Sequence, residues 1–145
     1  MKNLDLELLI PHRPPALIVT GVESQGQGSL IATGQIDHDH PMAVQESVPS
    51  ILAMEFAAQS AGLLLGLLQS VEDPDTPAPT AGYLVSLRDV RLERPQLSVD
   101  GSLVANVQLE GRLGSMALFS ATVREDGEIV AEGRLAVAAQ KGKPR

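Results

Sequence analysis

The amino-acid sequence predicts an α+β fold in which one long helix is wrapped by an antiparallel β-sheet. Three observations lead to this prediction. The first is a single apolar stretch, residues 51–68, in which 13 of 18 residues are Ala, Ile, Leu, Met or Phe. The second is a set of strand-like segments on both sides of that stretch. The third is a set of Gly-containing turn signals between those segments.

The part of the chain before the apolar stretch predicts two strands. Residues 16–22 and 29–36 are rich in β-branched side chains, which favour extended backbone. The Gly-rich residues 25–28 join them as a turn. Residues 37–48 are polar and irregular, so we expect a loop there.

The apolar stretch predicts a buried helix that starts at Pro49 or Ser50 and fades near residue 70. Its length is at the lower limit for crossing a membrane. Glu55, Gln59 and Ser60 lie inside it, however, and an ionised carboxylate is costly in lipid. We therefore expect the centre of a globular domain and no membrane span. Residues 71–80 contain three prolines and predict an exposed loop.

The second half of the chain predicts about four strands, at 82–93, 103–113, 116–124 and 129–138. Hairpin-type turn signals separate them at Asp100-Gly101, Gly114-Ser115 and Asp126-Gly127. We expect a single domain over residues 1–140 and a disordered tail over 141–145. A sheet that covers one helix leaves an edge strand exposed, which predicts a dimer formed by edge-strand pairing.

Composition excludes several classes of function. The 145 residues carry a net charge of −7 and only 2% aromatic side chains, so a nucleic-acid partner is not expected. The chain has no Cys, which excludes a disulfide framework, a thiolate nucleophile and a zinc-thiolate site. The first residues lack the apolar core of a signal peptide, so the expected location is the cytoplasm.

Glu55 is the most informative polar residue, because it lies inside the apolar helix. Gln59 follows at i+4 and shares its helix face. A buried carboxyl group must be paired, hydrogen-bonded or protonated, and such a group suits general acid–base chemistry near neutral pH. The alternative is a structural Glu that faces solvent or an interface, with Gln59 as its hydrogen-bond partner.

Two histidines, His38 and His40, lie in the polar loop before the helix. A loop His can act as a general base. Together with Asp37 and Asp39 they also raise the question of a metal site. The alternating spacing matches no closed tetrahedral pattern, so we expect none.

Arg88, Arg91 and Arg94 recur every three residues in one predicted strand. On a strand this spacing alternates between faces, so the three cannot form one row. They predict either a local basic patch for an acidic partner or ordinary solvated side chains.

Three segments stand in a fixed order along the chain. They are Pro11-His12-Arg13-Pro14-Pro15; His40-Pro41 with Pro49 and Glu55-Phe56-Ala57-Ala58-Gln59; and Gly82-Tyr83-Leu84-Val85, running to Arg94-Pro95. Together they resemble the hot-dog-fold 3-hydroxyacyl-[acyl-carrier-protein] dehydratases, and the first two are similar to the divergent branch found in aryl-polyene clusters. The resemblance spans residues 8 to about 138.

The resemblance implies a hot-dog fold in which two subunits form one continuous sheet, with active sites at the dimer interface. It implies that His40 abstracts the α-proton of a 3-hydroxyacyl thioester and that Glu55, facing it from the other subunit, protonates or holds the departing hydroxyl. Backbone N–H groups around Ser50 and Ile51 would polarise the thioester oxygen, as helix N-termini do elsewhere. Gln59 completes the expected substrate-binding residues.

The reaction implied is dehydration to a trans-2-enoyl thioester in fatty-acid-like or aryl-polyene biosynthesis, without metal or diffusible cofactor. The expected partners are acyl carrier protein and a second hot-dog subunit, identical or paralogous. Two departures from the usual pattern keep alternatives open: the His-containing loop is reduced to His40-Pro41, and Ser50 replaces a Gly. For the function, the alternatives are a non-catalytic subunit that supports an active paralogue and an acyl thioesterase. For the general base, the alternative to His40 is His38.

Overall fold

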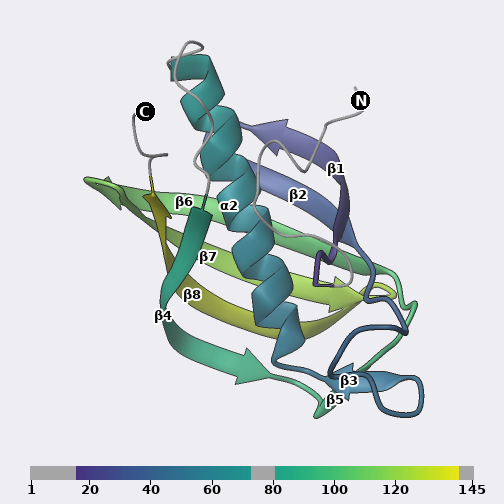
Figure 1. The fold of residues 1–145 in the computed structure, drawn as a ribbon. Helices are drawn as coiled ribbons and strands as arrows, with labels where there is room; N and C mark the ends of the chain where they lie inside the picture. The colour runs from purple at the N-terminus through teal and green to yellow at the C-terminus, as the bar shows by residue number, and fades with distance from the viewer. Residues whose placement is uncertain (1–15, 73–80, 141–145) are drawn as a thin grey trace.

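A six-stranded antiparallel sheet curves around one long helix in the computed structural model (Figure 1). The structure describes residues 16–72 and 81–140. The elements are β1 (Val19–Gly26), β2 (Ser29–Gly34), β3 (Ser47–Pro49), α2 (Leu52–Glu72), β4 (Ala81–Leu92), β5 (Gln96–Ser98), β6 (Leu103–Leu113), β7 (Met116–Glu125) and β8 (Glu128–Gln140). The predicted α+β class, with one helix wrapped by an antiparallel sheet, is confirmed.

The strand order of the large sheet is β1-β2-β6-β7-β8-β4. Two hairpins join β6, β7 and β8, and their turns have the predicted chemistry. Asp126 and Gly127 have φ of 50° and 88°, and Gly114 has φ of 63°, which is the left-handed region that such turns require. The hairpin expected at Asp100-Gly101 is wrong, because β5 pairs with β3 and not with β6.

The helix α2 lies on the concave face of the sheet and packs against β2, β6, β7 and β8. It starts two or three residues after the predicted position, at Leu52, and ends two residues after it, at Glu72. Phe56 is fully buried under β2, and a Cβ on Gly34 would lie 2.5 Å from the Phe56 ring. Gly34 therefore lets the helix approach the sheet. Within the described residues, no helix combines the length and the apolar character needed to cross a membrane.

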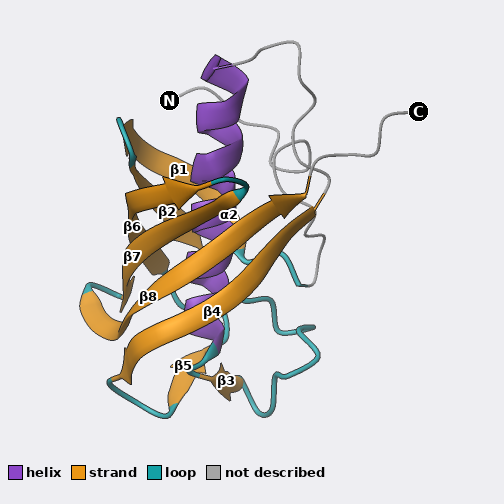
Figure 2. Ribbon diagram, turned by 90° about the vertical axis from the view of Figure 1, so that its left-hand side faces the viewer, coloured by secondary structure: helices purple, strands orange, loops and turns teal. Residues whose placement is uncertain are grey.

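The strand β4 forms one edge of the large sheet, beside β8, with α2 behind the sheet (Figure 2). Its pairing with β8 shifts register twice, between Leu84 and Ser86 and between Arg88 and Arg91. Asp89 lies in the second shift and has φ of 53°. These two bulges explain why the sequence of this strand alternates only loosely.

A second, two-stranded sheet of β3 and β5 was not predicted, because residues 37–48 were expected to be a loop throughout. It lies beside the start of α2 (Figure 1). The backbone N–H of Ser50 donates to the Pro95 carbonyl at 3.0 Å, and the N–H of Val99 donates to the Glu46 carbonyl at 2.9 Å. The small sheet therefore fixes the chain where it enters the helix.

Several expectations fall outside the described residues. They concern the Pro11–Pro15 segment with His12, most of the loop expected over 71–80, and the tail at 141–145.

Candidate active site

One pocket of about 350 Å³ collects both residues expected to carry out chemistry. His40 reaches it from the loop before β3, and Glu55 reaches it from the first turn of α2. Leu84 and Leu87 of the edge strand β4 form an apolar wall. The remaining lining residues are Ala16, Ile51, Leu52 and Met54. A mostly aliphatic pocket with a few polar groups suits an acyl chain that carries one reactive end.

His40 is almost buried, at 9% exposure, and its ring is oriented by its own loop. The Met42 N–H donates to His40 Nδ1 at 3.1 Å. The His40 backbone is held as well, because its N–H donates to the Asp37 carbonyl and its carbonyl accepts from Ala43. Since Nδ1 accepts a hydrogen bond, the neutral ring carries its proton on Nε2.

Glu55 is half-buried and is held from behind by Gln59. The Gln59 Nε2–H donates to Glu55 Oε1 at 3.3 Å and to the Ala16 carbonyl at 2.8 Å. Gln59 Oε1 accepts from the N–H groups of Ile18, at 2.8 Å, and Val19, at 3.3 Å. The amide is fully buried and does not line the pocket, so the structure sets Gln59 behind Glu55, where it ties the start of β1 to the helix.

The start of α2 supplies backbone donors, but not from every position that the sequence suggested. Ser50 is buried, and its N–H is already donated to Pro95. Ile51 and Leu52 both line the pocket. Within residues 16–72 and 81–140, neither of their N–H groups has an acceptor. The free donors at the positive end of the helix are therefore those of Ile51 and Leu52.

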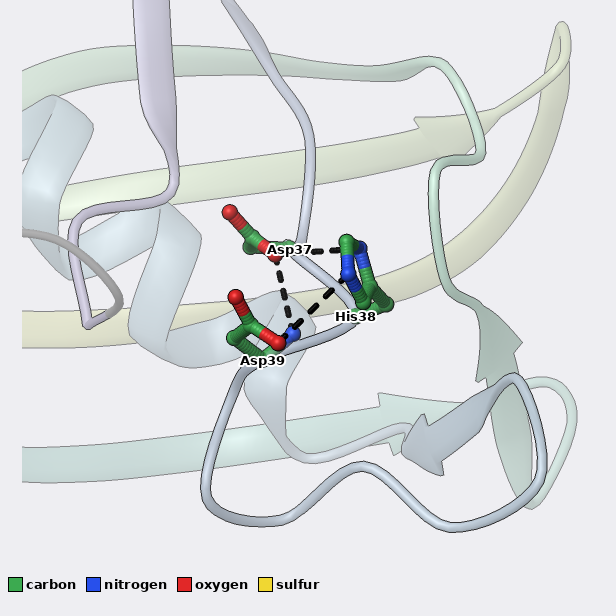
Figure 3. Close-up of side chains that lie close together, drawn as sticks. All are labelled: Asp37, His38 and Asp39. Carbon is green, nitrogen blue, oxygen red and sulfur yellow. Dashed lines mark hydrogen bonds and ion pairs between the residues drawn. The ribbon is translucent and has the colours of Figure 1, made fainter.

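His38, the alternative base, lies elsewhere. Its Nδ1 is 3.3 Å from Asp37 Oδ1 and its Nε2 is 3.5 Å from Asp39 Oδ1 (Figure 3). The Asp39 N–H also donates to Asp37 Oδ1, at 2.9 Å. The ring is exposed and lines a different hollow, beside Thr20 and Asp100. A single residue, Asp39, thus separates the histidine in the pocket, His40, from the histidine outside it, His38.

Asp37, His38 and Asp39 offer ligand atoms within 4.8 Å of one another, which is close enough for a cation. All three side chains are exposed. The three side chains lie close together because they are consecutive in the loop and contact one another, and we assign no ion to them.

Arg94 is the residue whose role the sequence analysis missed. Its guanidinium bonds Glu125 Oε1 and Glu128 Oε2, each at 3.0 Å. Glu125 is only 2% exposed, and its Oε2 accepts the Ser98 N–H at 2.9 Å. Arg94 and Glu125 therefore fix the position of β5 and of the adjacent Pro95, whose carbonyl accepts the Ser50 N–H. The sequence offered no signal beyond charges that lie 31 residues apart.

Comparison with known proteins gives a consistent result. Residues 4–144 match the family model of the ApeP-like dehydratases. The chain is 31% identical over 142 residues to the 3-hydroxyacyl-[acyl-carrier-protein] dehydratase FabZ of Burkholderia lata, covering 92% of this chain and 89% of that protein. It is 30% identical over 133 residues to the corresponding FabZ of Anaeromyxobacter dehalogenans, covering 88% and 83%.

Solved structures share the fold. The dehydratase heterocomplex ApeI:P from Xenorhabdus doucetiae matches with a TM-score of 0.85 at 19% identity, covering 97% of this chain and 93% of that one. A hypothetical thioesterase with coenzyme A from Streptococcus pneumoniae matches with a TM-score of 0.57 at 10% identity, covering 85% and 87%. These likenesses support the hot-dog architecture, which dehydratases and thioesterases have in common.

Proposed function

Because the chain belongs to the ApeP-like dehydratase family, we propose that it removes water from 3-hydroxyacyl thioesters carried on acyl carrier protein and yields trans-2-enoyl thioesters. One observation supports this proposal above the others. His40, Glu55 and the free N–H groups of Ile51 and Leu52 all border one aliphatic pocket. Elimination of water needs a proton acceptor, a proton donor and a site for the developing enolate oxygen, and this pocket offers all three.

The hydrogen bonds favour a particular division of roles. Met42 donates to His40 Nδ1, so the neutral ring offers an Nε2–H to a ligand. Glu55 Oε1 already acts as an acceptor for Gln59. In this proposal the Glu55 carboxylate takes the α-proton and passes it to the 3-hydroxyl, which departs as water, while His40 Nε2–H donates a hydrogen bond to that departing oxygen. The Ile51 and Leu52 N–H groups bind the thioester oxygen. The resemblance implied the opposite roles for His40 and Glu55.

The first experiment is mass spectrometry of a carrier-bound 3-hydroxyacyl thioester after incubation with the purified protein. We expect loss of one water, abolished in Glu55→Gln and retained in His38→Ala, the matched loop variant. Release of the free acid would indicate a thioesterase, and no reaction at any chain length would indicate a supporting subunit. Neither alternative is favoured at present, because the thioesterase-like neighbours share only the fold.

Exchange of the α-proton separates the two divisions of roles. The protein is incubated with substrate in deuterated water, and deuterium at C2 is followed by NMR. If Glu55 is the base, His40→Asn keeps the exchange while losing dehydration, and Glu55→Gln loses both. If His40→Asn instead loses the exchange, His40 is the base and the proposed assignment is wrong.

The proposed assembly is a dimer that pairs the β4 edges of two subunits. Leu84 and Val85 are 40% and 54% exposed on this edge, and Leu84 also lines the pocket. The partner is a second copy or a hot-dog paralogue, by analogy with the ApeI:P dehydratase heterocomplex. Light scattering of the chain, alone and with a paralogue, tests this. The proposal includes a cytoplasmic location, where carrier-bound acyl chains are made.

The resemblance also implies that His40 of one subunit works with Glu55 of the other. Co-purified His40→Ala and Glu55→Gln subunits give a direct test. Activity of the mixed dimer would support a shared site, since one of its two pockets would then hold both native residues. An inactive mixture would support a site built from one chain.

A further inference from the structure

A small hollow on the outer face of the sheet has no part in the proposed chemistry. It has a volume of about 210 Å³. Leu87 and Leu135 point to the helix side and contact the core, so their neighbours Arg88 and Arg134 point outward. The residues that line the hollow are Ser86, Arg88, Glu110, Leu118, Phe119, Arg134, Leu135 and Ala136.

Two arginines meet across this hollow. Arg88 of β4 is the direct register partner of Arg134 of β8. Directly opposed side chains on one face start about 5 Å apart at Cβ, and like charges in this position destabilise the pair. Within residues 16–72 and 81–140, neither arginine makes an ion pair. The fold therefore maintains two adjacent, uncompensated cations in a chain of net charge −7.

The other arginines near this edge are compensated. Arg91, three residues along β4, has Glu132 as its register partner and Glu93 at 3.8 Å. Arg94 binds both Glu125 and Glu128. An uncompensated pair beside compensated ones is the kind of local conflict that proteins keep at binding sites.

The side chains that line the hollow indicate which class of ligand it can bind. Two guanidinium groups side by side match the oxygens of a phosphate, which they bind through paired N–H donors. The Ser86 hydroxyl has no partner among the described residues and supplies a further donor. The floor of Ala136 and Leu118 is apolar and small, so the hollow suits a phosphate ester with a short organic group and not a helix or peptide.

We propose that Arg88, Arg134 and Ser86 form a binding site for a phosphate group on the outer face of the sheet. Glu110 is the one carboxylate in the lining, and its Oε1 accepts the Ser120 hydroxyl at 2.7 Å, which holds it at the rim. Edge pairing through β4 leaves this site open, because side chains leave a strand perpendicular to the sheet. The proposal goes beyond the dehydration proposed above and does not depend on it.

Calorimetric titration with two matched probes tests the site. Phosphopantetheine and pantetheine differ only in the phosphate. We expect the phosphorylated probe to bind about tenfold more tightly or better, the size of one charge-assisted hydrogen bond. Arg134→Gln and Arg88→Gln should each remove most of this preference. Arg91→Gln, the matched control on the same strand, should keep it, and Glu110→Gln should increase it.

Inorganic phosphate identifies the source of the ligand. If it binds with the same dependence on Arg88 and Arg134, and phosphopantetheine binds no more tightly, the site takes free phosphate. If phosphopantetheine binds more tightly than phosphate, the site takes a phosphate ester. Equal binding of phosphopantetheine and pantetheine, or a preference that survives both arginine substitutions, would overturn the proposal. These readouts measure binding only, so a failure of dehydration leaves them unchanged.

Discussion

Two buried polar side chains, Gln59 and Glu125, fix neighbouring segments of the chain near the start of the helix, and they do so in different ways. Gln59 is a neutral amide that lies fully inside the molecule, next to Glu55. Glu125 is a carboxylate at the end of β7, where it binds Arg94. The Arg94 side chain is 36% exposed, so water reaches this pair.

The contrast between a neutral amide and a charged carboxylate shows which kind of buried group can be placed beside the carboxylate of Glu55. An amide with all its hydrogen bonds made can be buried without a net charge, so it orients Glu55 without adding a second ion. A buried carboxylate needs a cation, and the desolvation cost is smaller at the rim of the sheet. The Arg94–Glu125 ion pair therefore does not touch the start of the helix directly. It positions β5 and Pro95, and the Pro95 carbonyl in turn binds the Ser50 N–H, just before the helix.

The largest expected effect is that of Gln59→Leu. This change removes the acceptor of the buried Ile18 and Val19 N–H groups, while the Ala16 carbonyl is exposed and can bind water. We expect a loss of about 3 kcal/mol in the free energy of unfolding, because an orphaned buried group costs about 1–3 kcal/mol. Denaturant unfolding measures it. The neighbouring Ser60→Ala is the control, since Ser60 bonds only a helix carbonyl, and it should cost less than about 1 kcal/mol.

Glu125→Gln should have the second largest effect, about 2 kcal/mol, because Arg94 loses its buried charged partner. Glu128→Gln is the matched control. Glu128 binds the same guanidinium but is 79% exposed, and exposed ion pairs are screened by solvent, so the loss should stay below about 0.5 kcal/mol. Equal losses for the two variants in denaturant unfolding would show that burial does not distinguish these carboxylates.

Gly101→Ala tests how closely the chain packs on Glu125. A Cβ at Gly101 would lie 2.9 Å from Glu125 Oε2 and 3.3 Å from the Ser98 carbonyl. We expect a loss of about 1 kcal/mol in unfolding free energy, since the packed carboxylate must shift. At Gly111 a Cβ would meet nothing within 4 Å. Gly111→Ala should therefore leave the thermal midpoint unchanged or raise it.

The smallest expected effect is a gain in stability from the turn before β3, the strand that pairs with β5. Gln45 and Glu46 have φ of 51° and 66° in the turn before β3, a conformation that costs ordinary side chains energy. The double change Gln45→Asn and Glu46→Gly should add about 0.5–1 kcal/mol, because both new residues tolerate this region. Calorimetric unfolding measures the gain. An unchanged or lowered midpoint would mean that the two native side chains stabilise the turn in another way.

Much of the fold could be predicted from the sequence because its signals are local. The alternation over residues 103–113 predicted β6 with its observed bounds, and Asp126-Gly127 predicted the β7–β8 turn. The helix was found because one apolar stretch is long enough to require burial. These features depend on residues within a few positions of one another.

The remainder depends on contacts that link distant parts of the chain. The strands β3 and β5 have three residues each, which is too short to produce an alternating pattern. The Ser50 N–H looked available until Pro95 was found to accept it. Likewise, His38 and His40 are equivalent as loop residues, and only the path of the loop separates their surroundings.

The strand order has a consequence for synthesis. β2 pairs with β6 and β4 pairs with β8, so two of the five pairings in the large sheet join strands that are far apart along the chain. The meander β6-β7-β8 is made of local hairpins and can form quickly, but it leaves the ribosome after the helix. The apolar helix emerges long before the surface that covers it. The nascent chain therefore keeps that helix exposed while its second half is translated, and protection by a ribosome-associated chaperone would matter most in this interval.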